Sequence, residues 1–247
     1  MTALSRPTLW LGMLFFSIAL CAFASSDDPN RLWLVVQSCV AAEEKIGIPL
    51  PCLKVNLRGG TIVLRAPFER THLLLVPTTK ISGLESPMLR SEGDGIYWKA
   101  AVDARSILMD QLAGRQVEAV GFAANSQASR SQDQFHIHID CVKPEVRRTL
   151  LRESASFEDR WSRLPFYLEG QHYYGRKIAE ADLAGANLVG SLMNDVASLR
   201  NAPSAVTIGL IALHPTNTEP DFYAVANLAY ASGQGAEILL DHRCSDR

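Results

Sequence analysis

The chain has 247 residues, of which 47% are hydrophobic and 20% are charged. This composition is typical of a globular protein with one large domain or two small ones. The formal net charge is -2 and no run of Lys or Arg stands out. A nucleic acid is therefore not expected as a partner, because its phosphates require a basic patch.

An apolar stretch near the N-terminus predicts export. Residues 9–24 carry no charge, Arg6 precedes them, and the polar residues 25–28 follow. Small residues at Ala22 and Ala24 fit a signal-peptide cleavage site, but the run is also close to the ~20 residues that span a bilayer. We therefore expect residues 1–26 to be a signal peptide or a retained signal anchor, which would associate the protein with a membrane.

Export favours disulfides among the cysteines that follow the leader. Cys39, Cys52, Cys141 and Cys244 are an even number, and an oxidising compartment permits them to pair. Of the three possible pairings, one joins Cys39 to Cys52 across a short loop and Cys141 to Cys244, which would tie a central strand to the C-terminus. Free buried thiols are the alternative.

The first predicted elements follow the leader directly. Residues 30–42 have the apolar spacing of a helix, and residues 61–65 and 72–76 are apolar runs typical of strands. The second run is apolar on both faces, as in a strand at the middle of a covered sheet. Residues 97–112 then form the clearest amphipathic helix pattern.

The second half of the chain adds further strands and helices. The predicted elements are strands at 118–123 and 135–141, a helix beginning near Pro144, a helix at 179–198, and strands at 205–213 and 222–229. The order of these elements predicts an α+β domain, in which an antiparallel sheet has helices packed on one side.

The strongest chemical signal is the segment QFHIHIDC at residues 134–141. In a strand alternate side chains share a face, so Gln134, His136, His138 and Asp140 are expected on one face. The first interpretation is a polar outward face, and the second is a metal site, since two histidines on one strand can bind an ion together. The third is covalent catalysis, in which a neutral imidazole attacks phosphorus.

A resemblance supports the third interpretation. The segments LLLVPTTKISGLESPML, NSQASRSQDQFHIHIDCVKPEVR and DHRC resemble the bacterial CDP-diacylglycerol pyrophosphatases, and QFHIHID is similar to the motif of the histidine-triad superfamily. The similarity runs from about Leu32 to Cys244. It implies a histidine-triad-like sheet over residues 27–247 and hydrolysis of CDP-diacylglycerol to CMP and phosphatidate. It also implies a location at the bacterial inner membrane, with the domain in the periplasm. A histidine nucleophile requires no metal or other cofactor, because the imidazole attacks phosphorus directly.

The resemblance assigns roles to the two motif histidines. His136 matches the nucleophile that takes the nucleoside monophosphate, and His138 matches the histidine that contacts phosphate oxygens or the leaving group. Gln134 stands where the superfamily has its first histidine. A glutamine can donate a hydrogen bond to phosphate but cannot carry a proton, so His138 or a water molecule would have to act as the acid.

Other positions are candidates for binding the substrate. Asn125 and Ser131 fall near phosphate-binding positions of the family, and His72 lies at its pocket histidine. Lys80 and Arg130 could meet the pyrophosphate. Asp140 could orient one of the histidines, whereas His242 is expected to be structural or at the surface.

Two rival functions stay open. One is a histidine-triad hydrolase or transferase of the cell envelope that acts on soluble nucleotide esters. The other is an envelope protein that binds a metal through His136 and His138.

Overall fold

The computed structural model describes residues 28–112, 119–213 and 221–244. The predicted leader, residues 1–26, lies outside the described residues. Within the described ranges, no helix has both the length and the apolar character needed to cross a bilayer.

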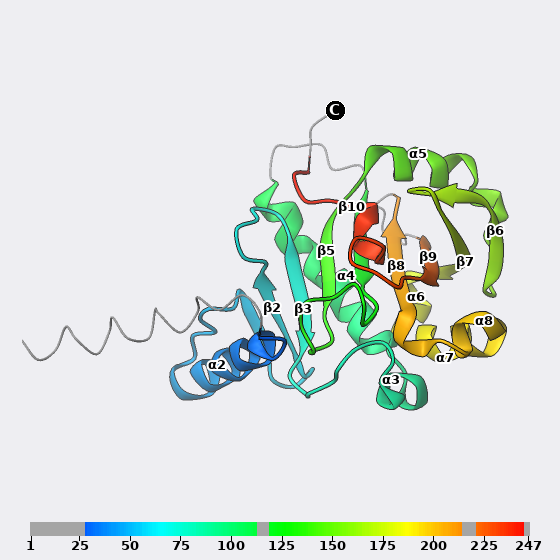
Figure 1. Ribbon diagram of the computed structural model, residues 1–247. Coiled ribbons are helices and arrows are strands. Elements are labelled where there is room, and N and C mark those ends of the chain that lie inside the picture. Colours follow the sequence, from blue (N-terminus) through cyan, green and yellow to red (C-terminus); the bar gives the residue numbers. More distant parts are fainter. Residues whose placement is uncertain (1–27, 113–118, 214–220, 245–247) are drawn as a thin grey trace, which may run out of the picture.

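A single antiparallel sheet forms the centre of the protein (Figure 1). Its strands in chain order are β1 (Lys54–Asn56), β2 (Thr61–Arg65), β3 (Leu73–Pro77), β4 (Val120–Ala124), β5 (Ile137–Val142), β6 (Ser162–Leu168), β7 (Gln171–Ala179), β8 (Val206–Ala212), β9 (Asp221–Leu228) and β10 (Leu240–Asp241). Across the sheet the order is β1-β2-β3-β5-β4-β8-β9-β7-β6, and the short β10 pairs with β5. The predicted α+β class and antiparallel sheet are confirmed.

The helices are more numerous than the sequence pattern predicts. They are α2 (Arg31–Ile46), α3 (Pro87–Glu92), α4 (Gly95–Gln111), α5 (Pro144–Arg152), α6 (Glu180–Leu183), α7 (Leu188–Asp195) and α8 (Ala197–Arg200), with 3-10 turns η1 (Ser154–Ser156), η2 (Pro203–Ala205) and η3 (Ala236–Leu239). The segment expected as one helix over 179–198 is therefore divided into α6, α7 and α8.

Asp94 helps to fix the start of α7. Its carboxylate accepts hydrogen bonds from the backbone N–H of Leu188 (2.6 Å) and from the indole of Trp98 (2.7 Å). The carboxyl group is completely buried, and this burial raises its pKa to about 6. Asn187 is the local N-terminal cap of α7, because its Oδ1 accepts from the N–H of Gly190 (2.6 Å). The distant Asp94 adds acceptors at the same helix end, which local spacing does not indicate.

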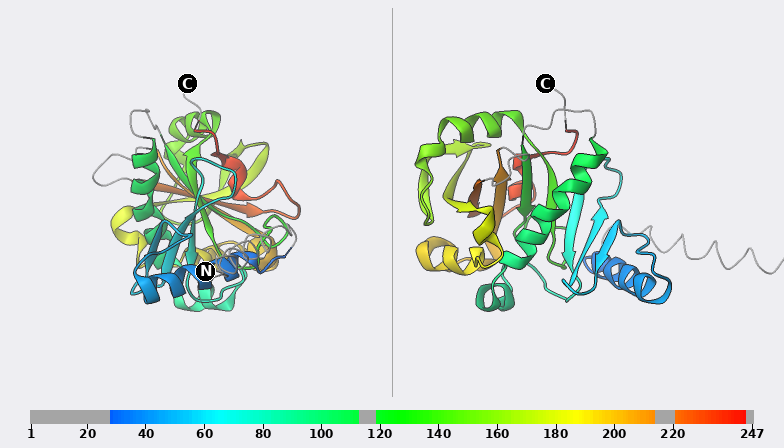
Figure 2. Two further views of the ribbon diagram at one scale, coloured as in Figure 1. Left: turned by 90° about the vertical axis from the view of Figure 1, so that its left-hand side faces the viewer. Right: turned by 180° about the vertical axis from the view of Figure 1, so that it is seen from behind.

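Helices cover both faces of the sheet. The long helix α4 lies across the face seen from behind in Figure 2, where Trp98 and Leu108 pack with Leu73 and Leu75 of β3. On the opposite face α2 packs against Leu74 and its neighbours, and α5 packs against β8 and β9. The expected covering of one face thus describes α4, whereas on the other face η3 and β10 also pack on β4 and β5.

Both disulfides of the pairing described above are present. Cys39–Cys52 ties α2 to the segment before β1, with the Cα atoms 5.8 Å apart. Cys141–Cys244 ties β5 to the C-terminal segment, with the Cα atoms 5.2 Å apart. Such bonds persist in oxidising compartments, so they indicate a domain outside the cytoplasm.

Candidate active site

The candidate site lies on the sheet face opposite α4. In β5, Ile137 and Ile139 point into the core beneath α4, so His138 and Asp140 point to the other face. Strand pairing places His138 opposite Leu74 of β3 and Ala123 of β4. His72 directly precedes β3 and Asn125 directly follows β4, so both side chains reach His138.

His136 has the protonation pattern of a nucleophile. Its Nδ1 lies 2.7 Å from the backbone carbonyl of Gln134, and a carbonyl oxygen can only accept, so Nδ1 carries the proton and Nε2 keeps its lone pair. Burial lowers the pKa of the ring, although the hydrogen bond to Gln134 opposes this shift. The imidazole is therefore neutral at pH 7, and 8% of His136 stays exposed.

A chain of hydrogen bonds fixes the tautomer of His138. The Oδ1 atom of Asn125 accepts from the N–H of Glu237 (3.3 Å), so its Nδ2 atom donates to Glu237 Oε2 (2.7 Å) and to His138 Nε2 (3.3 Å). The proton of neutral His138 is thus on Nδ1, which donates to His72 Nε2 (2.7 Å). His72 in turn donates from Nδ1 to the carboxylate of Glu69.

These hydrogen bonds leave His138 able to accept a proton on Nε2. Burial holds the pKa of His138 well below its ordinary value, so its Nε2 lone pair is free of a proton at neutral pH. The ring lies next to His136, with 4.8 Å between the ring centroids. If Nε2 takes a proton, the Glu237 carboxylate 3.4 Å away stabilises the resulting imidazolium.

His242 closes the cluster from the C-terminal segment. Its Nδ1 lies 3.1 Å from Asp140 Oδ2 and its Nε2 lies 3.2 Å from Glu237 Oε1, and its ring stacks on His72 with 4.2 Å between centroids. Burial by itself lowers the pKa of His242, but the hydrogen bonds to Asp140 and Glu237 prevail and raise it to about 10. His242 is therefore a cation held between two carboxylates.

Glu237 balances this charge. Burial by itself raises the pKa of its carboxyl group, but the histidines around it and the Asn125 amide hold that pKa well below its ordinary value. A cavity of about 320 Å³ adjoins the cluster here, and Asn125, Glu237 and His242 contribute to its lining.

The structure brings together only part of the predicted site. His72, Asn125, His136 and His138 lie in one cluster, as described above. Gln134 is fully buried, and its amide donates to the carbonyls of Pro77 (3.1 Å) and Thr79 (2.9 Å) while its oxygen accepts from Ile81 N–H (3.3 Å). The expected contact of Gln134 with phosphate would require this amide to leave these backbone partners.

Four other candidates lie away from the histidines or have partners of their own. Ser131 and Lys80 are exposed on loops. The side chain of Arg130 is buried and makes a bidentate ion pair with Glu85, at 2.9 and 2.8 Å. Asp140 is in the cluster, but it orients His242 and not His136 or His138.

The sequence interpretation missed Glu69, Glu237 and the role of His242. Glu69 stands three positions before His72, so a glutamate close to a candidate histidine was the available signal. His242 belongs to the DHRC segment, whose resemblance to the family was a second signal. Glu237 lies in the short turn η3 and reaches the site only through tertiary contacts, so no local pattern indicates it.

Two groups of side chains in the cluster are of metal-ligating type. One consists of His72, His138 and Glu237, and the other of Glu69, His72, Asp140 and His242. The nitrogens of His72 and His138 are only 2.7 Å apart. Two ligands at about 2.0–2.1 Å from a tetrahedral ion would be about 3.3 Å apart, so this pair fits a hydrogen bond better than shared coordination.

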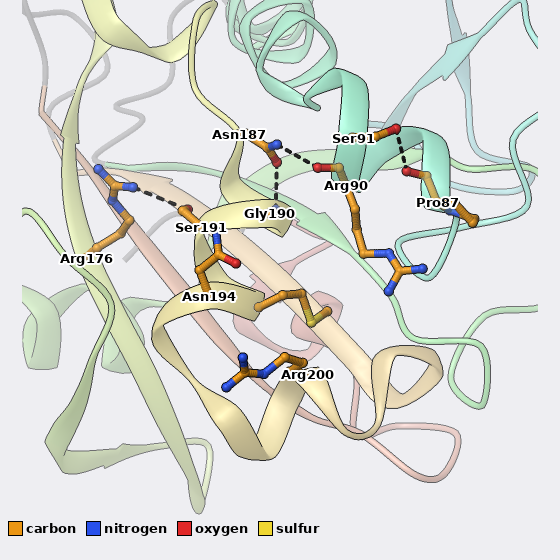
Figure 3. Close-up of a pocket in the computed structure, with 10 residues that line it drawn as sticks. Pro87, Arg90, Ser91, Arg176, Asn187, Gly190, Ser191, Asn194 and Arg200 are labelled. Carbon is orange, nitrogen blue, oxygen red and sulfur yellow. Dashed lines mark hydrogen bonds between the residues drawn. The ribbon is translucent and has the colours of Figure 1, made fainter.

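A second cavity of about 650 Å³ lies between α3, α7 and β7 (Figure 3). Arg90, Arg176 and Arg200 line it, and Arg176 reaches Ser191 Oγ at 3.5 Å. None of the clustered histidines contributes to its lining. This cavity is therefore separate from the candidate site.

Comparisons with known proteins decide the family. The sequence model of the CDP-diacylglycerol pyrophosphatase family matches residues 27–246. A CDP-diacylglycerol pyrophosphatase of Yersinia pestis is 31% identical over 254 residues, which cover 98% of this chain and 96% of the relative. The chain belongs to the CDP-diacylglycerol pyrophosphatase family. The expected class of enzyme, a hydrolase of a pyrophosphate bond, is the class of this family.

The matches among solved structures are exemplified by a distant one. A crystal structure of the yeast Ap4A phosphorylase Apa2 in complex with AMP aligns with a TM-score of 0.40 and 17% identity. The alignment covers 70% of this chain and 57% of the yeast chain.

Proposed function

We propose that this pyrophosphatase-family protein hydrolyses CDP-diacylglycerol to CMP and phosphatidate through a cytidylyl-histidine intermediate on His136. The observation that carries the proposal is the hydrogen bond from His136 Nδ1 to the Gln134 carbonyl, which leaves Nε2 unprotonated. We place the chain in the histidine-triad superfamily on the QFHIHID motif alone, with glutamine at the first position.

The first step forms a bond between His136 Nε2 and the phosphorus of the cytidylyl group. The bond from that phosphorus to the bridging oxygen breaks, and phosphatidate leaves with the electron pair. The ring then carries a positive charge that it shares with Nδ1–H. The Gln134 carbonyl stabilises this charge, so the hydrogen bond strengthens as the reaction proceeds.

The second step is hydrolysis of the intermediate. A water molecule attacks the same phosphorus, the bond to Nε2 breaks, and CMP leaves with the new oxygen. His138 Nε2 takes the proton of the water, and Glu237 stabilises the imidazolium that forms. The Glu69–His72 pair holds the opposite nitrogen of His138 in place throughout.

The remaining site residues have supporting roles in this scheme. Asn125 fixes His138 and can turn its amide to a phosphate oxygen, and Gln134 positions His136 by holding residues 77–81. Ser131 and Lys80 are exposed and can meet the nucleotide or the lipid headgroup only from outside the cluster. Residues 27–247 form the catalytic domain in the periplasm, either held at the inner membrane by the leader or released from it.

Substitution of His136 tests the proposal. His136→Asn keeps a polar side chain of similar size but removes the nucleophile, so CMP release from CDP-diacylglycerol should fall at least about 10³-fold. The matched control is His172→Asn, because His172 is an exposed histidine of β7 far along the sheet. A folded His136→Asn variant with the activity of the control contradicts the proposal.

The ligand-type cluster supports one second candidate, a metal-binding protein of the envelope. The observation that favours this function is the presence of two overlapping groups of histidines and carboxylates around His72. Zinc analysis of the purified protein tests this function. Stoichiometric zinc that is lost in His72→Asn, together with absence of CMP release, would favour it over hydrolysis.

A further inference from the structure

We propose that the edge of the protein formed by residues 31–70 docks on the surface of an anionic phospholipid bilayer. This edge comprises α2, the segment 47–60, β2 and the tip of the β2–β3 hairpin, and it faces the viewer in the left view of Figure 2. The inference rests on the proposed function for the identity of the lipid substrate, and on four separate observations for the contact.

Exposed apolar side chains gather on this edge. Among the described residues, ten large hydrophobic side chains are strongly exposed, and six of these are found within residues 46–68. They are Ile46, Ile48, Leu50, Leu53, Leu57 and Phe68. A concentration of this kind in a short part of the chain marks an interaction surface, whereas single exposed residues would be scattered.

The segment 47–60, which carries most of these side chains, is held in place by covalent and backbone contacts. The Cys39–Cys52 disulfide ties it to α2, and the N–H of Leu53 donates to the carbonyl of Val63 in β2 (2.8 Å). β1 is the terminal strand of the sheet. The backbone of this segment is therefore held in place by other contacts, while its apolar side chains stay exposed.

Phe68 is the most unusual of these residues. It lies at the tip of the β2–β3 hairpin, is fully exposed, and has a φ of 67°, in the left-handed region that a bulky residue rarely adopts. Burial within the protein does not offset the cost of this conformation, because the ring packs on nothing. Insertion of the ring among lipid headgroups and acyl chains would offset it.

The charge of the edge is complementary to anionic lipids. Residues 31–70 contain six Lys and Arg and three Glu, whereas the whole chain has a net charge of -2. Lys45, Lys54 and Arg58 are exposed among the apolar side chains. Cations beside apolar residues are the pattern of surfaces that bind anionic membranes.

Docking at this edge brings the membrane to the site. Glu69, the neighbour of Phe68, accepts the hydrogen bond of His72, which holds His138. A bilayer in contact with the hairpin tip would thus lie beside the histidine cluster. The apolar run 9–24 precedes α2 by only a few residues in the sequence, so an anchor there would hold the same edge at the membrane.

Photo-crosslinking of the full chain tests the contact between this edge and lipid, and its readout does not depend on enzymatic activity. A photoreactive phenylalanine analogue is placed at Phe68 or, as a control, at Tyr167, an exposed aromatic residue on β6 at the opposite end of the sheet. With vesicles containing phosphatidylglycerol, a lipid adduct is expected at position 68 and not at 167. Equal labelling at both positions, no lipid adduct at 68, or an adduct there to residues 9–24 instead of lipid overturns the proposal.

Activity measurements provide the second test. Phe68→Asn suits a left-handed backbone, and together with Leu50→Ser it should lower kcat/KM on CDP-diacylglycerol in vesicles by roughly tenfold for each side chain. Cleavage of a water-soluble short-chain CDP-diacylglycerol should be unchanged, and Tyr167→Asn should leave both activities unchanged. Equal losses on both substrates overturn the docking proposal, whereas failure of wild-type protein to cleave either one refutes the proposed function instead.

Discussion

His242 should make the stability of the protein depend on pH. Its ring lies between Asp140 and Glu237, and these contacts raise its pKa to about 10 from an ordinary value of 6.5. The folded state therefore binds this proton more tightly than the unfolded state does. The stabilisation is complete below about pH 6.5 and is lost as the pH rises through about 10.

The size of the effect follows from these two pKa values. At 1.36 kcal/mol for each pH unit between 6.5 and about 10, the upper limit is roughly 5 kcal/mol. The His242 side chain is 28% exposed, and water screens its charge, so we expect about 2 kcal/mol. His242→Gln keeps a hydrogen-bond donor but removes the charge, so it should lose this amount.

Urea unfolding at about pH 6 and about pH 10, with the disulfides intact, measures the difference. The variant should be less stable than wild type at the lower pH and nearly as stable at the higher pH. His172→Gln, which changes an exposed histidine, should show no such trend. A gap between wild type and His242→Gln that is the same at both values would refute the charge-based reasoning.

Three further predictions concern activity and folding. Burial lowers the pKa of His136, so its imidazole should stay neutral and kcat/KM should be maintained until the pH falls below 6.5. A pH-rate profile in which kcat/KM already falls at pH 6.5 or higher would contradict this. Glu69→Gln weakens the hold on His72, so kcat should fall roughly 10- to 100-fold with KM little changed; an unchanged kcat would rule out the positioning role. Replacing Cys141 and Cys244 together by Ala removes a disulfide that joins residues 103 positions apart. In denaturant titrations this should lower the free energy of unfolding by about 4 kcal/mol. A loss below about 1 kcal/mol would contradict a stabilising role of this disulfide.

Much of the sheet was predictable because its strands are strongly apolar. The runs at 61–65 and 72–76 correspond to β2 and β3, and the runs at 205–213 and 222–229 correspond to β8 and β9. The β6–β7 hairpin was missed. Its outer strand β6 lies at the edge of the sheet and buries only Leu164 and Leu168. It also carries Arg163 and Pro165, so its apolar signal in the sequence is weak.

The site was predictable only as far as local spacing reaches. The alternation of residues 134–141 correctly indicated that His138 and Asp140 share a face, but it also placed Gln134 there. The regular strand begins only at Ile137, and the chain before it turns Gln134 inward to the backbone of 77–81. Glu237 and His242 come to β5 through η3, β10 and the Cys141–Cys244 disulfide, which are tertiary features without a sequence period.

The central claim is the covalent bond to His136, and trapping tests it most directly. The protein is mixed with CDP-diacylglycerol labelled in the cytidine for less than one turnover, quenched in alkali, and digested for mass spectrometry. A cytidylyl group on the peptide that contains residues 135–141, located on His136 and more abundant in His138→Gln, is the predicted result. Label on a different residue, or normal CMP release with no histidine adduct in either protein, would contradict the account.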